Sequence, residues 1–559
     1  MQRSSLPRRA AAGLAHLAIA ISTALAACTP RTVPVPSPMS DRWDIIIING
    51  RVVDGTGNPW YYADVAVSGD RIARVAPKLP RERAARIIDA RGMVVSPGFI
   101  DMLGHSEHSI LRNRTAVSKV TQGITSEITG EVSSAWPNTV AGEEPRTPTW
   151  TSLDGYFRHL ETTGVAINLG TYVAAASVRR AVMGDAARRP TATELARMGD
   201  LVEEAMRDGA MGFSTGLIYA PSTFFTTAEL TTLARHAAPF GGGYASHIRN
   251  EGDSLLPAIR EAIAIGNGAG TWTHIRHLKV NGAANWGRMG AAVALIDSAR
   301  AAGLDVTADM YPYIAAGTGL DAMLPTWAQS GGTDSLLVRL KDPATRARIA
   351  ADTTGEWWQP AARVMINNAR ADSLAGYEGR RLDEIGRMRN QDPYEAALDI
   401  LVADSGGTSA IYFAMSEDDL RLAMRASWVS VGQDAGAATP AADGLGRGHP
   451  RGFGTFPRIL GRYVRDEGVL TLEDAVRKMT SLAAQRVGID DRGLLKQGFF
   501  ADVVIFDPAS IRDEATFESP QRVATGVRYV MVNGEIVLDE NGITTKLPGR
   551  AIRGPGHAR

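Results

Sequence analysis

The sequence predicts an α/β protein in which a (β/α)8 TIM barrel, at about 97–487, is joined to a small β-sandwich built from both chain ends, 41–96 and 488–550. In the central part, short β-branched and aromatic runs alternate with amphipathic helical segments, which is the pattern of a parallel barrel. We expect eight barrel strands, beginning near Gly98, Ile124, Val165, Met211, Gly243, Trp272, Asp305 and Trp428.

The expected sandwich rests on short apolar strands at the two ends of the chain. An apolar run begins at Asp44, a hairpin is expected at 64–75, and further strands are expected at 501–506 and 527–537. Dipeptides that favour tight turns occur at 49–50, 69–70 and 533–534. The barrel lies between the two groups of strands in the sequence, so we expect the sandwich to form where the chain enters and leaves the barrel.

Helical periodicity supports the barrel between the strands. Amphipathic helices are expected at 193–207, 255–265 and 291–302. The segment at about 325–400 is too long for one connection. We expect it to form a small helical insertion over the barrel mouth, where it would shape a substrate pocket.

The amino-terminal segment has the pattern of a lipoprotein signal peptide, 1–28. Three arginines precede an apolar run that ends in small residues, and Leu25-Ala26-Ala27-Cys28 resembles the bacterial lipobox. This predicts lipidation of Cys28, followed by a Pro/Ser/Thr-rich tether at 29–40. The alternative is an ordinary signal peptide with an incidental cysteine. The expected location is the bacterial cell envelope, on the periplasmic side of the outer membrane, because no aspartate follows Cys28.

The composition indicates a globular protein. The chain of 559 residues has 60 basic and 60 acidic residues and 44% hydrophobic residues, as in a globular protein with a large core. The absence of a basic excess argues against a nucleic-acid partner. The one cysteine excludes a disulfide within the chain. A monomer is expected.

Two histidines stand at the ends of consecutive expected strands. Gly-Gly-Tyr-Ala-Ser-His ends at His247, and Thr-Trp-Thr-His-Ile-Arg-His ends at His277. In a parallel barrel, catalytic groups gather at the carboxyl ends of the strands. Neutral imidazole is a preferred zinc ligand, so the pair could hold a metal. The alternative is that either histidine caps a strand or satisfies a polar layer.

Several motifs in a fixed order carry a resemblance to a known family. They are Ser96-Pro97-Gly98-Phe99-Ile100-Asp101, Ser246-His247-Ile248-Arg249-Asn250-Glu251-Gly252, His277-Leu278-Lys279, Asp309-Met310-Tyr311-Pro312-Tyr313, Gly454-Thr455-Phe456-Pro457-Arg458 and Gly498-Phe499-Phe500-Ala501-Asp502. The chain resembles the amidohydrolase superfamily, in its D-aminoacylase (N-acyl-D-amino-acid deacylase) branch. The resemblance covers nearly all of 44–556.

The resemblance implies a metal-dependent hydrolase. A divalent metal such as zinc activates water and polarises the amide carbonyl, while an aspartate after the last strand transfers the proton. Matched by motif, His247 and His277 are metal ligands, and Asp434 is the general base and a possible further ligand. The alternative for Asp434 is an ordinary turn aspartate.

Two positions depart from the family pattern. Where the family has His-x-His after the first strand, this chain has Leu103 and His105, and Leu103 cannot bind a metal. His108 is a less favourable substitute because it lies beyond the strand end. Where D-aminoacylases use a cysteine after a glycine, this chain has Val132, with Glu131 one residue earlier. A carboxylate is a competent zinc ligand, so Glu131 is the candidate, with a pocket acid or ligand-supporting role as the alternative.

The expected cofactor is therefore one tightly bound zinc ion held by Glu131, His247 and His277. His105 and Asp434 could form a weaker second site or act near the nucleophile. The resemblance further implies that the substrate carboxylate of an N-acyl amino acid is bound by Lys279, Tyr311 and Arg451. The family's serine in this region corresponds to Gly317, which has no hydroxyl to make that contact. The alternative for Arg451 is a surface position at a helix start.

Three functional hypotheses follow. The first is a metal-dependent amidase for N-acyl-D-amino acids or related small amides that bear a carboxylate. The second is a dipeptidase or cyclic-amide hydrolase of the same fold, distinguished by tolerance of a free α-amino group or a ring. The third is a lipid-anchored binding protein that has lost catalysis. Its only support is Leu103, which stands where the family has a metal-binding histidine.

Overall fold

The computed structural model describes residues 42–141, 150–440 and 448–558. The expected signal peptide 1–28 with Cys28, and the expected tether at 29–40, lie outside these residues. In the part of the chain that is described, no helix has the length and apolar character needed to cross a bilayer.

The centre of the chain forms a closed parallel barrel with eight strand positions, so this prediction is confirmed. The third position consists of two short strands, β8 and β9, on either side of Tyr172. Closure is made between the first and last positions, where the Met102 N–H donates to the Val431 carbonyl at 3.1 Å. The strands are β6 (Phe99–Asp101), β7 (Ile124–Thr129), β8 (Asn168–Thr171), β9 (Val173–Ala174), β10 (Gly212–Gly216), β11 (Gly243–His247), β12 (Thr273–Ile275), β13 (Val306–Met310) and β17 (Val429–Val431).

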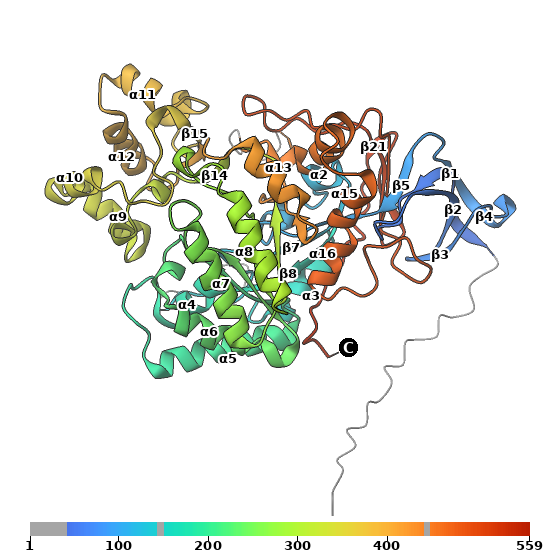
Figure 1. Ribbon diagram of the computed structural model, residues 1–559, viewed down its shortest axis with the longest axis horizontal. Helices are drawn as coiled ribbons and strands as arrows, with labels where there is room; N and C mark the ends of the chain where they lie inside the picture. Colours follow the sequence, from blue (N-terminus) through green and yellow to red (C-terminus); the bar gives the residue numbers. More distant parts are fainter. Residues whose placement is uncertain (1–41, 142–149, 441–447, 559) are drawn as a thin grey trace, which may run out of the picture. The chain divides into compact units, whose positions relative to one another are not determined.

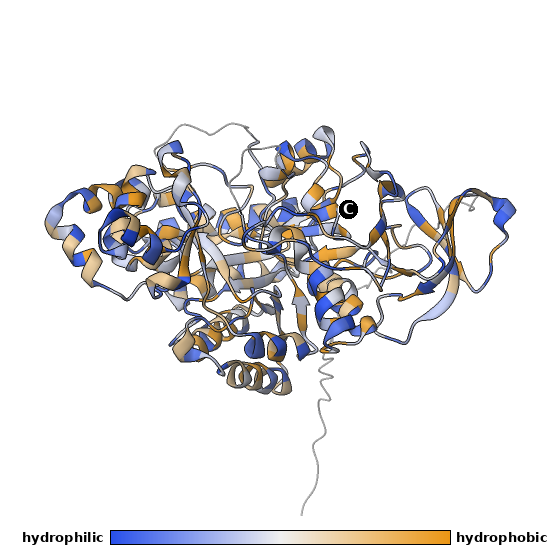
Figure 2. Ribbon diagram, turned by 90° about the horizontal axis from the view of Figure 1, so that it is seen from above, coloured by the Kyte–Doolittle hydropathy of each residue, from blue (hydrophilic) through white to orange (hydrophobic). Residues whose placement is uncertain are grey.

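The helices between the strands carry a hydrophobic and a hydrophilic face, as Figure 2 shows. The three expected helices are found with ends shifted by at most four residues, as α5 (Ala192–Asp208), α7 (Leu255–Ala269) and α8 (Met289–Ala301). Helix α5 starts where Thr191 and Glu194 form a reciprocal capping box. The other helices of this part are α1 (Ser109–Arg112), α2 (Val117–Val120), α3 (Leu153–Thr163), α4 (Ala175–Met183), α6 (Thr227–Arg235), α13 (Glu417–Arg425), α14 (Arg451–Arg458), η9 (Ile459–Asp466), α15 (Leu472–Met479) and α16 (Ser481–Arg486).

Strands from both chain ends form the second structural part, drawn in blue and red in Figure 1. Strand β18 pairs antiparallel with β5, which joins the two groups into one continuous nine-stranded sheet. Apolar side chains from both groups share a common core. The strands are β1 (Trp43–Val52), β2 (Tyr61–Ser68), β3 (Arg71–Ala76), β4 (Ala84–Asp89), β5 (Val94–Pro97), β18 (Val503–Phe506), β19 (Val527–Val532), β20 (Glu535–Asp539) and β21 (Gly542–Ile543).

The prediction of a turn at 49–50 is wrong. Strand β1 continues through these residues, and its pairing with β2 shifts register between Ile47 and Gly50. Asn49 has a positive φ of 63°, as at a β-bulge. A Cβ at position 50 would lie 2.4 Å from the Val95 side chain, so glycine is needed where β5 packs against the bulge. The turns at 69–70 and 533–534 do occur, between β2 and β3 and between β19 and β20.

A long inserted segment, 316–412, separates β13 from β17. It is wider than the expected 325–400 and is not purely helical, because β14, β16 and β15 form a three-stranded antiparallel sheet beside the helices. These strands have only four or five residues each, and β14 reads Ala-Gly-Thr-Gly, which gives little strand signal in the sequence. The elements are β14 (Ala316–Gly319), α9 (Gly332–Lys341), α10 (Pro343–Ala351), β15 (Val364–Asn368), α11 (Leu382–Arg389), α12 (Pro393–Ala403) and β16 (Ser409–Tyr412).

A buried polar network joins the sheet to the barrel. Asp502, one residue before β18, forms an ion pair with Arg492 and accepts a hydrogen bond from the Asn533 N–H at 2.8 Å. The amide of Asn168, the first residue of β8, donates to Asp502 at 3.3 Å. The network therefore fixes the third barrel strand to the sheet.

We expect Asp502→Ala to lower the free energy of unfolding by about 3–5 kcal/mol, because it leaves the buried Arg492 charge without its partner. The measurement is urea denaturation of a soluble form that begins after Cys28. As a control, Asp418→Ala removes a carboxylate that is 97% exposed and should cost under about 0.5 kcal/mol. Equal costs for the two variants would contradict a structural role for this network.

Candidate metal centre and active site

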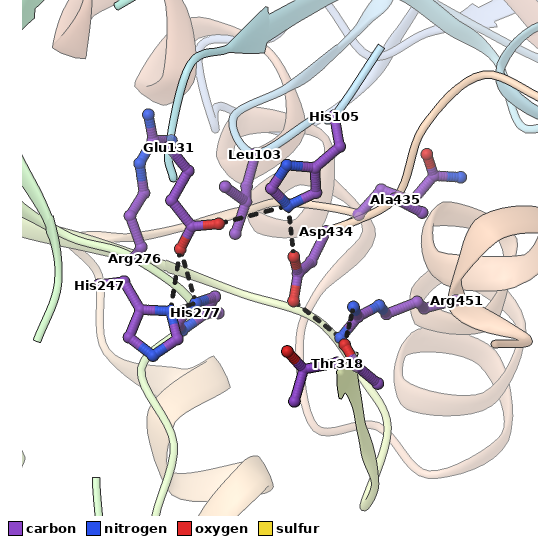
Figure 3. Close-up of polar contacts among 12 residues, drawn as sticks. Leu103, His105, Glu131, His247, Arg276, His277, Thr318, Asp434, Ala435 and Arg451 are labelled. Atoms are coloured by element: carbon purple, nitrogen blue, oxygen red, sulfur yellow. Dashed lines mark hydrogen bonds and ion pairs between the residues drawn. The ribbon is translucent and has the colours of Figure 1, made fainter. Parts of the chain in front are cut away.

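Three potential metal ligands converge at the carboxyl ends of three barrel strands. Glu131 follows β7, His247 ends β11, and His277 lies two residues after β12. Glu131 Oε1 is 3.1 Å from His247 Nδ1 and 2.8 Å from His277 Nε2, and the two nitrogens are 2.8 Å apart. All three side chains are buried, and Figure 3 shows them turned toward one another. The structure thus brings together the three residues predicted to hold the tight zinc ion.

A second group of ligand atoms shares Glu131 with the first. His105 Nε2 lies 3.3 Å from Glu131 Oε2 and 2.8 Å from Asp434 Oδ1 (Figure 3). Each carboxylate oxygen of Glu131 therefore faces a different group of donors. The structure brings together His105 and Asp434, the residues predicted for a weaker second site, and adds Glu131 to them.

Unusual backbone conformations direct these side chains. Gly130 has a φ of 90°, and a Cβ there would lie 2.5 Å from the Tyr172 carbonyl, so only glycine fits directly before Glu131. His277 and Asp434 have positive φ values of 33° and 55°. Non-glycine residues in such conformations store strain and need support from their surroundings. Asp309 Oδ1 gives this support to His277, accepting its N–H at 2.6 Å.

The loops after β6 and β17 are held together by a buried ion pair. Lys119 Nζ donates to Asp101 Oδ2 at 2.9 Å and to the Ala435 carbonyl at 2.7 Å. Asp101 Oδ1 accepts from the N–H groups of Leu103 at 3.1 Å and Gln433 at 2.8 Å. These contacts fix the two loops that carry His105 and Asp434.

The donor set of the first group fits a metal ion such as zinc. Two imidazole nitrogens and a carboxylate oxygen, each able to use a lone pair, meet in a buried site and leave one position of a tetrahedron open. The second group offers a single imidazole, because Leu103 is fully buried and has no ligand atom. His108 does not replace the missing histidine, since its ring stacks on Trp150 at 6.1 Å, outside both groups.

Asp434 is held in its ionised form. Arg451 Nη1 lies 2.7 Å from Asp434 Oδ2, while His105 contacts the other oxygen. Burial opposes ionisation, but the guanidinium and the imidazole outweigh it and hold the pKa of Asp434 below its ordinary value. A carboxylate in this state can accept a proton.

A cavity of about 280 Å³ opens onto both groups. The three residues predicted to bind a carboxylate line it. Tyr311 is buried and, among the described residues, its hydroxyl has no hydrogen-bond partner. Arg451 Nη2 donates to the Gly317 carbonyl at 3.0 Å, and Lys279 is already paired with Glu251 at 2.7 Å. The lining residues are His105, Glu131, Val132, Tyr219, His247, His277, Lys279, Tyr311, Ala316, Gly317, Thr318, Trp357, Asp434 and Arg451.

Sequence reasoning assigned no role to Glu251 or Trp357. Glu251 lies four residues after His247, with Oε1 3.1 Å from His277 Nδ1. Burial alone would raise its pKa, but Lys279 and the two imidazoles lower the pKa to about 2. The position of Glu251 in the motif after β11 could have identified it from the sequence as a candidate site residue. Trp357 comes from the inserted segment, whose sequence gives no such signal.

Comparison with known proteins agrees with this geometry. The model of the amidohydrolase family matches residues 86–538. A D-aminoacylase of Alcaligenes xylosoxydans xylosoxydans is 35% identical over 522 residues, covering 92% of this chain and 98% of the relative. An N-acyl-D-glutamate deacylase structure from Bordetella bronchiseptica, complexed with zinc and a phosphonate inhibitor, is 34% identical with a TM-score of 0.79, covering 92% and 100% of the two chains.

A second solved structure bears on the metal count. It is a D-aminoacylase described by a binuclear metal centre with one-metal activation and second-metal attenuation. It is 35% identical and has a TM-score of 0.77, and the match covers 91% of this chain and 99% of that structure. The chain therefore belongs to the amidohydrolase family, in its D-aminoacylase branch, and is a hydrolase of carbon–nitrogen bonds other than peptide bonds.

Proposed function

We propose that the protein is a zinc-dependent hydrolase of N-acyl-D-amino acids. The observation that carries the proposal is the convergence of Glu131, His247 and His277 beside the ionised Asp434 in one cavity. The activities named for the relatives support an N-acyl substrate and the D configuration.

In the proposed reaction, zinc and Asp434 have separate roles. When bound, zinc supplies a Lewis acid that lowers the pKa of water and polarises the amide carbonyl. Asp434 takes a proton from the attacking water and delivers it to the amine nitrogen as the carbon–nitrogen bond breaks. The products are a carboxylic acid and a free amino acid. Thus one residue serves as general base and then as general acid.

The charges around the cavity favour a single divalent ion. Glu131, Glu251 and Asp434 are buried carboxylates, whereas Lys279 and Arg451 are buried cations. With neutral imidazoles these side chains carry a net charge of minus one. A divalent ion changes this to plus one, and a substrate carboxylate then neutralises it. Two ions would leave a large positive charge in a site of low dielectric constant, which is unfavourable.

We further propose that Tyr311, Arg451 and Lys279 bind the substrate carboxylate. The Tyr311 hydroxyl is free to donate, and Arg451 Nε, which is buried, has no partner among the described residues. A guanidinium and a phenol are both suited to a carboxylate. Arg451 also holds Asp434, so it should affect turnover as well as binding.

A lipid-anchored location in the cell envelope is also proposed. It is supported by the sequence of Leu25 to Cys28 and by the tether that follows. In this arrangement the hydrolase would act on small substrates at a membrane surface, on the periplasmic side.

The function is tested by assaying the zinc-loaded soluble form for release of free amino acid from N-acetyl-D-amino acids and their L enantiomers. We expect turnover of the D series, with Asp434→Asn lowering kcat by about 10²–10⁴-fold while zinc remains bound, because only the proton transfer is lost. Failure of all N-acyl substrates would contradict the proposed activity. A near-normal rate for Asp434→Asn would remove Asp434 as the base.

Zinc content tests the metal count. Elemental analysis should give about one zinc per chain, and about two in Leu103→His, because the new imidazole completes the second group of ligands. Leu103→Ile keeps the volume without adding a ligand and should remain at one. Two zinc ions in the unaltered chain would show that Leu103 does not exclude the second ion.

Tyr311→Phe tests the carboxylate site. We expect KM for N-acetyl-D-amino acids to rise about tenfold with kcat little changed, since one hydrogen bond to a charged group is worth about 1.5 kcal/mol. Steady-state kinetics with the corresponding amino-acid amides provide the control, because they lack the carboxylate. An equal rise in KM for acids and amides would show that the hydroxyl does not recognise the carboxylate.

A further inference from the structure

The carboxylate of Glu251 faces both candidate metal-binding imidazoles from the side opposite Glu131. Glu251 Oε1 is 3.1 Å from His277 Nδ1 and 3.7 Å from His247 Nε2. These are the ring nitrogens that do not face Glu131. The side chain is 1% exposed, so solvent cannot take its place.

A metal-binding imidazole needs such a partner. The nitrogen that binds the metal must be unprotonated, so the proton of the neutral ring lies on the other nitrogen and requires an acceptor. Among the described residues, neither His247 Nε2 nor Glu251 Oε2 has a hydrogen-bond partner, so the 3.7 Å approach of Glu251 Oε1 to His247 Nε2 is an electrostatic contact and not a hydrogen bond. Lys279 Nζ lies 2.7 Å from Glu251 Oε1 and 2.6 Å from His277 Nδ1. Glu251 Oε1 is therefore the common acceptor for this ammonium and for the Nδ1 proton that a zinc-bound His277 carries.

The position of Glu251 is itself fixed from the inserted segment. The Glu251 N–H donates to Glu356 Oε1 at 2.7 Å, and the Asn250 side chain donates to Glu356 Oε2. The Asn281 side chain donates to the Glu356 carbonyl at 2.8 Å. Glu356 thus connects the segment 316–412 to the loops after β11 and β12.

We propose that Glu251 is a positioning residue that keeps the proton of His277 on Nδ1, the nitrogen facing away from Glu131, and that its charge orients the ring of His247, while Glu356 fixes Glu251 for this role. The proposal rests on the proposed function in one respect, that these histidines bind zinc. It adds a reason for the inserted segment beyond lining the cavity, because the segment then supports the metal centre.

Zinc affinity, measured by chelator competition on the soluble form, tests the proposal without reference to turnover. We expect Glu251→Gln to weaken binding by about 10–100-fold, the loss typical of partners of metal-binding histidines. The absorption spectrum of the cobalt-substituted protein should change as the imidazoles reorient. Glu356→Gln should weaken binding in the same direction but less, because an amide NH₂ cannot accept from both donors.

Glu261→Gln is the matched control. Glu261 also pairs with a residue of the loop after β11, accepting from Arg249 Nε at 2.9 Å, but it faces neither imidazole. The zinc affinity of the Glu261→Gln variant should equal that of the unaltered chain. If Glu251→Gln does not fold, Glu251→Asp replaces it, since a carboxylate one methylene shorter is withdrawn from the rings and should also lose affinity.

The outcomes separate this proposal from the proposed function. Unchanged zinc affinity and an unchanged cobalt spectrum in the Glu251 variant would overturn the positioning role and leave the zinc site in place. Unchanged affinity in Glu356→Gln alone would overturn the part played by the inserted segment. Failure of the unaltered chain to bind zinc would overturn the metal site and this inference together.

Discussion

Burial of charge at the mouth of the barrel is the constraint on which the rest of the site depends. Glu131, Asp434 and Glu251 are carboxylates from which water is largely excluded. Coulomb interactions are strong in such surroundings, so each needs an opposite charge at a fixed distance. The partners come from different strands and loops, and small shifts of a loop would leave a charge uncompensated. This explains why the loops after β6 and β17 are pinned by the fully buried Lys119.

The two departures from the family pattern are physically related. A carboxylate has two oxygens, and Glu131 directs one toward each group of donors. Leu103 meanwhile removes one ligand from the second group, and Arg451 already neutralises Asp434 there. A cation entering the second group would have to compete with this guanidinium. The loss of a ligand at Leu103 and the guanidinium of Arg451 therefore concentrate metal binding at the histidine pair after β11 and β12.

The sequence was sufficient for the barrel strands and the residues at their ends, because strand periodicity and motif order fix both. It was not sufficient at Asn49, since an Asn-Gly pair suits a two-residue turn and a bulge equally, and only the packing of Val95 on Gly50 decides between them. The strands of the inserted segment have only four or five residues each, and β14 reads Ala-Gly-Thr-Gly, so they also gave no signal. The contacts of Glu251 depend on the ring orientations of two histidines, which arise only in the folded chain.

The position of Arg451 links substrate binding to proton transfer. Its guanidinium lies 2.7 Å from Asp434 in the free protein and lowers the pKa of that carboxyl. A substrate carboxylate bound by Arg451, as proposed, would share this charge. The stabilisation of ionised Asp434 would then decrease and its basicity would rise. The base would thus be strongest when an acid substrate is present, so an amide lacking the carboxylate would lose more than its binding contacts.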